Sequence, residues 1–257
     1  MSRLVSITVL FGCGSGAPPH PVADHAVGSA VAPAIATAYR AESGDFAKGD
    51  VQVRVEWPDA PTVARASPGR TRCGTASAPD VAPTTTWGVP DAIVAIDADR
   101  GKPIVDPAAR VVVADCAIAP RVVVAGAAIT VASEVDHPLA LSLARAGDAQ
   151  PLEVGSATPA IALDLPISGH ALVAPLAAKS LDLLAGSDVE PAWIVTPAQP
   201  YVAITEASGQ VVLRDVPVGS YTVEALVPPR AGQPARSGRA TVAVTANALA
   251  DVTVQVR

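Results

Sequence analysis

The 257-residue sequence is poor in aromatic residues, in cysteine and histidine, and in basic charge. Aromatic residues make up only 3% of the chain, so Val, Ala, Leu and Ile must fill any core. The formal net charge is −6. Because nucleic acid and anionic lipid surfaces both bind basic protein faces, this charge argues against either as a partner. Three Cys and four His leave few ligands for a metal site.

Apolar residues and chain breakers are abundant instead. Hydrophobic residues make up 50% of the chain and charged residues 16%, a balance that supports one or two domains with buried cores and excludes disorder throughout. The 25 Pro and 19 Gly suit short strands joined by turns better than long helices. We therefore expect an all-β fold.

The N-terminus has the features of an export signal. Arg3 precedes the short apolar run Leu4–Gly12, and Cys13 follows. Residues 10–13, Leu-Phe-Gly-Cys, resemble the lipobox of bacterial lipoproteins, in which the cysteine becomes the lipidated first residue. We expect a signal peptide over residues 1–13, lipidation of Cys13, and a flexible tether over residues 14–49. The expected location is the periplasm or the outer membrane, with the lipid anchor as the only membrane contact, because no other apolar run is long enough to span a bilayer. A plain signal peptide and a cytosolic start are the alternatives.

Alternation of apolar and polar residues predicts the strands. The clearest is Val51–Trp57, whose sequence Val-Gln-Val-Arg-Val-Glu-Trp gives one buried and one solvated face. Residues 58–88 are expected to form a long surface loop, and Ala177–Leu184 either a strand or a helical turn. The other predicted strands are Asp91–Asp97, Arg110–Val113, Arg121–Val124, Ile129–Ser133, Leu139–Leu143, Ala160–Leu165, Ala171–Ala174, Ala192–Val195, Tyr201–Thr205, Gln210–Leu213, Tyr221–Leu226, Ala240–Val244 and Val252–Val256. Short strands at this spacing predict a β-sandwich.

Residues 201–225 carry two turn signals between predicted strands. Gly209 supplies the first turn, because glycine reaches positive φ without a steric clash, and Pro217 with Gly219 supplies the second, just before Tyr221. The segment resembles the carboxypeptidase regulatory-like module, which has a Thr-Asp-x-x-Gly-x-Phe hairpin followed by a Pro-x-Gly-x-Tyr turn. Two positions depart from that pattern, Glu206 and Val211. The resemblance implies a small Greek-key β-sandwich without catalytic function of its own.

A second resemblance begins at Cys116. Residues 116–131 run from this Cys through Pro120 into a Val-rich strand, Gly126 and another strand. They look like the start of a cupredoxin-like domain in certain secreted bacterial proteins, which carry an earlier Cys-Gly, matched at Cys73, and continue directly into the regulatory-like hairpin. The resemblance implies a regulatory-like sandwich built from residues 50–103 and 198–257, with a cupredoxin-like β-sandwich inserted at residues 104–197.

The copper ligands of such a domain are incomplete here. A blue-copper site needs a thiolate, two imidazoles and usually a thioether. In the family, a Cys-x-x-His loop precedes a strand that resembles residues 192–194. Matching the two places Leu184 at the cysteine, Ser187 at the histidine and Glu190 at the methionine. Because Leu and Ser cannot replace thiolate and imidazole, we expect no functional copper site and no cofactor.

His137 is the residual metal candidate. It lies near the place of the family's first copper-binding histidine, although the segment before it is shortened and lacks the family's Asn. A weaker site for a borderline metal would combine His137 with Asp136, Glu134 or His170, but their spacing gives it no support. The alternative is that both histidines are ordinary loop residues.

Cys73 and Cys116 are an even pair in a chain expected to be exported, so a disulfide between them is the default. Chain-entropy arithmetic gives such a cross-link about 4 kcal/mol of stabilisation. Two free buried thiols are the alternative.

The remaining reactive side chains do not complete a catalytic site. Ser168, His170 and Asp164 are the residue types of a hydrolytic triad, but no strand-to-helix nucleophile elbow accompanies them. Three tryptophans form either a carbohydrate-stacking face or core, namely Trp57, Trp87 and Trp193.

The sequence thus predicts a non-enzymatic, surface-tethered protein with a binding or structural role, whose partner is an envelope or extracellular protein or a glycan. The alternative is a periplasmic electron-transfer or copper-handling protein with an atypical site.

Overall fold

The computed structural model describes residues 46–60, 70–71, 74–75, 88–98, 100–101, 109–114, 117–145, 161–177, 180–186, 189–229 and 234–257, all within one compact unit. These residues form strands and turns, which confirms the all-β fold class. Within the same ranges, no helix is present that could cross a membrane.

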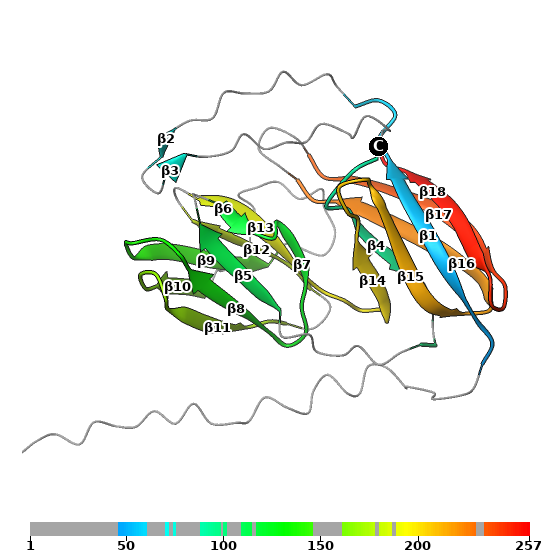
Figure 1. The fold of residues 1–257 in the computed structure, drawn as a ribbon, viewed down its shortest axis with the longest axis horizontal. Coiled ribbons are helices and arrows are strands. Elements are labelled where there is room, and N and C mark those ends of the chain that lie inside the picture. Colours follow the sequence, from blue (N-terminus) through cyan, green and yellow to red (C-terminus); the bar gives the residue numbers. More distant parts are fainter. Residues whose placement is uncertain are drawn as a thin grey trace, which may run out of the picture. The chain divides into compact units, whose positions relative to one another are not determined.

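Seven strands form a sandwich of two sheets, called the first sandwich below (Figure 1). Its three-stranded sheet has the order β15-β1-β18, and its four-stranded sheet has the order β14-β4-β16-β17. The strands are β1 (Lys48–Glu56), β4 (Ile93–Ile96), β14 (Tyr201–Ile204), β15 (Gln210–Pro217), β16 (Gly219–Val227), β17 (Arg236–Val244) and β18 (Leu249–Gln255).

The alternation in β1 fills the core of the first sandwich. Val51, Val53 and Val55 are fully buried, and the polar residues between them are partly exposed. The three valines pack in one cluster with apolar residues of both sheets, among them Val94, Ile96, Leu213, Val223 and Val254. Each such valine contributes about 1.5–3 kcal/mol of hydrophobic stabilisation relative to an exposed position. Aliphatic side chains thus do most of the packing, as the low aromatic content requires.

A bulge in β15 lies opposite Asp50. Gly49 pairs with Val216 and Val51 with Leu213, so two residues of β15 face one residue of β1. One of the two, Asp215, has a φ of 58°, in the left-handed region. Its N–H donates a hydrogen bond to Asp50 Oδ1 at 3.0 Å. The Asp50 carboxylate therefore accepts a backbone donor that the bulge turns away from the ladder.

The turn at Gly209 connects the two sheets of the first sandwich. Gly209 has a φ of 73°, and its N–H donates to the Glu206 carbonyl at 2.8 Å, so the turn itself is confirmed. However, β14 pairs with β4 and β15 pairs with β1, so the hairpin expected from the motif is wrong. Residues 217–219 likewise connect two sheets and not two paired strands, because the chain passes there from β15 in one sheet to β16 in the other.

Nine further strands form one sheet with the order β10-β9-β12-β13-β6-β5-β8-β11, and β7 also pairs with β13. Leu165 of β10 and Ala174 of β11, at the two ends of this order, belong to one buried cluster with Leu184 of β12. The nine-stranded sheet therefore curves back around a single core. Its strands are β5 (Arg110–Ala114), β6 (Ala117–Ala119), β7 (Val122–Val124), β8 (Ala128–Ser133), β9 (Leu139–Arg145), β10 (Ile161–Leu165), β11 (Ala171–Pro175), β12 (Ser180–Gly186) and β13 (Val189–Thr196).

A separate apolar cluster, called the junction cluster below, joins the nine-stranded sheet to the four-stranded sheet of the first sandwich. Trp193 is 5% exposed within it, and its indole Nε1 donates a hydrogen bond to the Pro229 carbonyl at 3.1 Å. From the nine-stranded sheet the cluster contains Val122, Leu181, Leu183, Trp193 and Val195, and from the four-stranded sheet Ile93, Val202, Ile204 and Leu226. Strand β12 therefore packs against a core on each face, since Leu184 belongs to the cluster of the nine-stranded sheet and Leu181 and Leu183 to the junction cluster.

Strands occur at each predicted segment, with ends that shift by a few residues, and Ala177–Leu184 falls on strand β12. Three short strands were not predicted. These are β6 and the two-stranded pair β2 (Arg70–Thr71) and β3 (Gly74–Thr75), the latter within the expected long loop.

Candidate functional site

The position that the resemblance assigns to a copper-binding cysteine is occupied by a core residue. Leu184 has an exposed fraction of 0% and belongs to the buried cluster of the nine-stranded sheet. On its two sides it pairs with Leu143 of β9 and Ala192 of β13. Ser187, at the expected histidine position, lies outside the described residues. Leu184 thus contributes packing at the position where the family has a sulfur ligand.

Glu190 takes part in an ion pair. Its Oε2 lies 2.8 Å from Arg121 Nη2, and the two side chains are 22% and 28% exposed. The pair connects β13 to the residue just before β7, its parallel neighbour. The carboxylate at the expected methionine position therefore helps to hold two strands together.

His137 and His170 lie on two loops that are hydrogen-bonded to each other. The loop between β8 and β9 contains His137, and the turn between β10 and β11 contains His170. Three backbone bonds join them: Ser168 N to Val135 O at 2.6 Å, Gly169 N to Ser133 O at 3.1 Å, and Ser133 N to His170 O at 3.0 Å. The topology therefore places the two histidines of the weaker predicted metal site on neighbouring loops.

The His137 side chain makes a local contact on its own loop. His137 Nδ1 lies 3.0 Å from Asp136 Oδ1. This hydrogen bond, with a backbone bond and the charge of His137, lowers the pKa of the Asp136 carboxyl. Among the described residues, no group of three or more His, Cys, Asp or Glu side chains is placed to hold a metal ion.

The residue types of the hydrolytic triad are separate on the surface. Asp164 is on β10, and Ser168 and His170 are on the turn that follows it; all three are exposed. The structure gives no hydrogen bond between these three side chains.

Two of the three tryptophans are core residues. Trp57 is 3% exposed, with the Arg236 guanidinium 3.9 Å from its ring centroid, and Trp193 is buried in the junction cluster. These two therefore do not form an exposed carbohydrate-stacking face. Trp87 and all three cysteines, Cys13, Cys73 and Cys116, lie outside the described residues.

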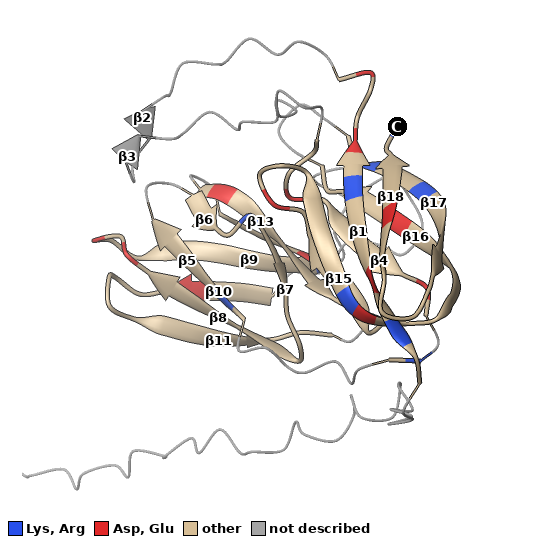
Figure 2. Cartoon of the chain, turned by 45° about the vertical axis from the view of Figure 1, so that its right-hand side comes forward, with Lys and Arg blue, Asp and Glu red and all other residues tan. Residues whose placement is uncertain are grey.

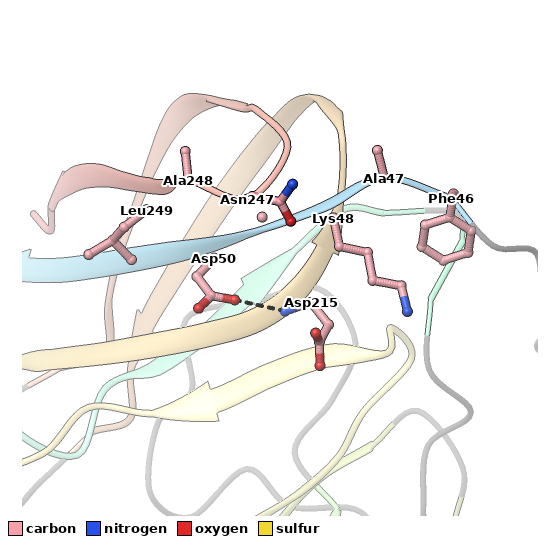
Figure 3. A pocket seen from close by; sticks show the side chains of 9 residues that line it. Phe46, Ala47, Lys48, Asp50, Asp215, Asn247, Ala248 and Leu249 are labelled. Atoms are coloured by element: carbon pink, nitrogen blue, oxygen red, sulfur yellow. Dashed lines mark hydrogen bonds between the residues drawn. The ribbon is translucent and has the colours of Figure 1, made fainter.

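A cavity of about 570 Å³ lies where β1 begins (Figure 3). It is lined by Phe46, Ala47, Lys48, Gly49, Asp50, Asp215, Asn247, Ala248 and Leu249. A second cavity of about 290 Å³ shares Phe46 and Ala47 with it and is also lined by Arg100, Pro217, Val218 and Tyr221. The volume of the larger cavity lies within the range of small-ligand sites.

The larger cavity combines charged, polar and apolar groups. Lys48 Nζ lies 5.2 Å from the Phe46 ring centroid, and the Asp50 carboxylate accepts the bulge hydrogen bond, drawn as the dashed line in Figure 3. Asn247 has a φ of 55°, and the Leu249 side chain is 52% exposed. Sequence reasoning missed this cavity, because three distant segments form it and Phe46–Gly49 were assigned to the tether.

Charges of both signs are interspersed on the described strands (Figure 2). Arg54 and Glu56 of β1 pair at 2.7 Å, and Arg239 of β17 pairs with Glu224 of β16 at 2.9 Å. Such partly exposed pairs each contribute about 0–1 kcal/mol.

Comparison of the chain with protein-family models, with curated proteins and with solved structures gave no match.

Proposed function

We propose that this chain is an exported, envelope-tethered β-sandwich protein with a binding or structural role and no catalytic function. In this proposal, residues 104–197 are a cupredoxin-like domain without a working copper site. The single observation that supports the absence of a working copper site is the burial of Leu184. A leucine packed between Leu143 and Ala192 supports core packing at this position, and its side chain has no atom that ligates copper.

The regulatory-like part of the proposal rests on the first sandwich. Two sheets share one aliphatic core, and Pro217 and Gly219 flank the point where the chain changes sheets. Tyr201, at the start of the resembling segment, donates its hydroxyl to the Asp215 carbonyl at 2.8 Å and so helps to hold the bulge. These features are compatible with a small sandwich that serves as a scaffold.

Among the described residues, the cavity beside Phe46 is the place we assign to a binding role. It offers an aromatic ring, an ammonium group and two carboxylates in one recess, with the apolar Leu249 at its rim. Groups of this kind suit a polar ligand such as a glycan or an extended peptide of an envelope or extracellular protein.

Metal analysis separates the proposal from the copper-handling alternative. Purified full-length protein is incubated with copper under reducing and oxidising conditions, desalted, and measured for metal content and visible absorbance. We expect substoichiometric copper and no thiolate-to-copper charge-transfer band. One tightly held copper per chain with such a band would overturn the proposal. His137→Ala with His170→Ala as its matched control then tests whether any bound metal uses the predicted residual ligand.

A further inference from the structure

Three of the five buried polar residues in the described ranges lie together on two adjacent strands. Ser180 and Asp182 are on β12, and Thr196 is on β13 directly opposite Ser180. The Asp182 side chain is 7% exposed. Asp182 alternates with Leu181 and Leu183, so it faces the core side of the sheet with Leu184. A carboxyl group at such a depth needs hydrogen bonds or a partner charge.

The Ser180 hydroxyl lies within hydrogen-bond distance of two oxygen atoms. Ser180 Oγ lies 2.8 Å from the Ala177 carbonyl oxygen and 2.6 Å from Asp182 Oδ2. A serine hydroxyl has a single proton to donate, and a carbonyl oxygen can only accept. If Ser180 donates to Ala177, the short contact with Asp182 is a hydrogen bond only when the carboxyl supplies its own proton. An ionised Asp182 would compete with the carbonyl for the one hydroxyl proton.

We propose that Asp182 is held in the folded protein as a neutral carboxylic acid that donates to Ser180, and that its ionisation weakens β12 at the junction cluster. The neutral acid lets both short contacts be hydrogen bonds at once, from Asp182 to Ser180 and from Ser180 to Ala177. The chain thus carries a pH-sensitive position in a strand that packs against an apolar cluster on each face.

Arg145 forms a long ion pair with Asp182, without a hydrogen bond. On β9, Arg145 Nε lies 3.9 Å from Asp182 Oδ1, beyond hydrogen-bond distance, and the Arg145 side chain is 52% exposed. On β13 the one ionisable group is Glu190, which is bound to Arg121. On the other strands of the sheet these groups are Arg110 and Asp164, both exposed. Lys179 and Asp188, which flank β12, lie outside the described residues.

Burial is the largest influence on the Asp182 carboxyl and raises its pKa, while the Ser180 hydroxyl and the Arg145 charge oppose this shift. An aspartate in the unfolded chain has a pKa of about 3.9. A group with a raised folded-state pKa contributes stability that is fully present below the unfolded value and is lost as pH rises through the folded value. Asp182 should therefore favour the folded state in acid and oppose it near neutral pH.

Because β12 contributes to the junction cluster, ionisation of Asp182 should affect that cluster. Leu181 and Leu183, on either side of Asp182, belong to the junction cluster with Trp193. A hydrogen bond lost at Asp182 loosens the strand that presents these leucines. Since Trp193 lies in that cluster, its fluorescence reports on the junction.

The test is a pH titration of the full-length protein with ¹³C-labelled aspartate, in which the Asp182 carboxyl carbon is assigned through its backbone. We expect its titration midpoint to lie above about 3.9. Asp182→Asn keeps a donor toward Ser180 but cannot ionise. We expect it to raise the Tm at pH 7 by about 2 °C or more relative to wild type, a difference that vanishes below pH 4.

Asp164→Asn is the matched control, since it removes an exposed carboxyl from β10 in the same sheet. Its Tm difference from wild type should not grow between pH 4 and pH 7. An Asp182 carbon that titrates at or below about 3.9 would overturn the proposal whether or not the variant folds. So would an Asp182→Asn variant that is equally destabilised at every pH.

Discussion

Asp50 and Asp182 are both on strands of this fold, and each is explained by the hydrogen bonds of its carboxyl group. Asp50 lies at the partly exposed start of β1 and accepts the Asp215 N–H at the bulge. Asp182 is buried with Ser180 Oγ 2.6 Å from its Oδ2, and we propose that the carboxyl donates in this contact. Neither role is visible in the sequence, because the partner of Asp50 is 165 positions away and the burial of Asp182 depends on the curvature of a whole sheet.

Asp50→Ala should destabilise the first sandwich by about 1–2 kcal/mol, because it removes the carboxylate that accepts the Asp215 N–H in the bulge. Asp50→Asn keeps an oxygen acceptor at the same place and should cost less. Urea unfolding monitored by circular dichroism gives both values. Equal losses for the two variants would show that the bond to the bulge is not what Asp50 contributes.

At the scale of strands, the alternation of apolar and polar residues predicts where strands lie in the sequence. Strict alternation identifies Val51–Trp57, and the structure has β1 at Lys48–Glu56. The short β6, Ala-Ile-Ala, was missed, because it lacks the run of β-branched residues that marks the equally short β7. The expected hairpin over residues 201–213 was wrong, because turn signals fix the turn but not the strand with which each arm pairs. Pairing is decided by burial of distant segments, here by β4 and β1.

Trp193 offers a test of whether the strands at the junction cluster act together. Trp193→Phe should cost about 1 kcal/mol through the lost hydrogen bond to Pro229, and Trp193→Ala about 3–5 kcal/mol through the lost packing. We expect the wild type to unfold in one transition and Trp193→Ala in two, because the cluster no longer couples the two cores. Calorimetry distinguishes these outcomes; a single transition in Trp193→Ala would contradict the coupling.

For the whole molecule, amino-acid composition predicts the all-β fold class but not the position of the cavity beside Phe46. High Val, Ala, Pro and Gly content with few aromatics is enough for an all-β fold, since aliphatic alternation and frequent turns leave little room for helices. The cavity beside Phe46 could not be predicted, because residues near 46, 215 and 247 meet only after both sheets form. The absence of copper-ligating residue types at Leu184 and Ser187, the positions that the resemblance assigns to ligands, could be predicted because it depends on residue types alone.

The cysteines give a prediction for the processed protein as a whole. Intact-mass analysis of protein purified from bacterial membranes should show removal of residues 1–12, a lipid on Cys13 and no alkylation by a thiol reagent in denaturant without reductant. The last result is expected because, in our proposal, the chain is exported to an oxidising compartment, where Cys73 and Cys116 would pair. Two alkylated cysteines would rule out the disulfide, and Cys73→Ser, which frees Cys116, is the positive control for the labelling.

The parallel pairing of β1 with β18 constrains the order in which the two cores form during synthesis. All seven register pairs of this ladder join residues 50–56 to residues 249–255 (Figure 1). The three-stranded sheet cannot close until β18, the last strand in the chain, has emerged, so a growing chain holds β1 with one edge uncovered. The nine-stranded sheet has no such delay, since every strand pair in it falls within residues 110–196. We therefore expect the nine-stranded sheet to fold first and the first sandwich to complete its folding afterwards.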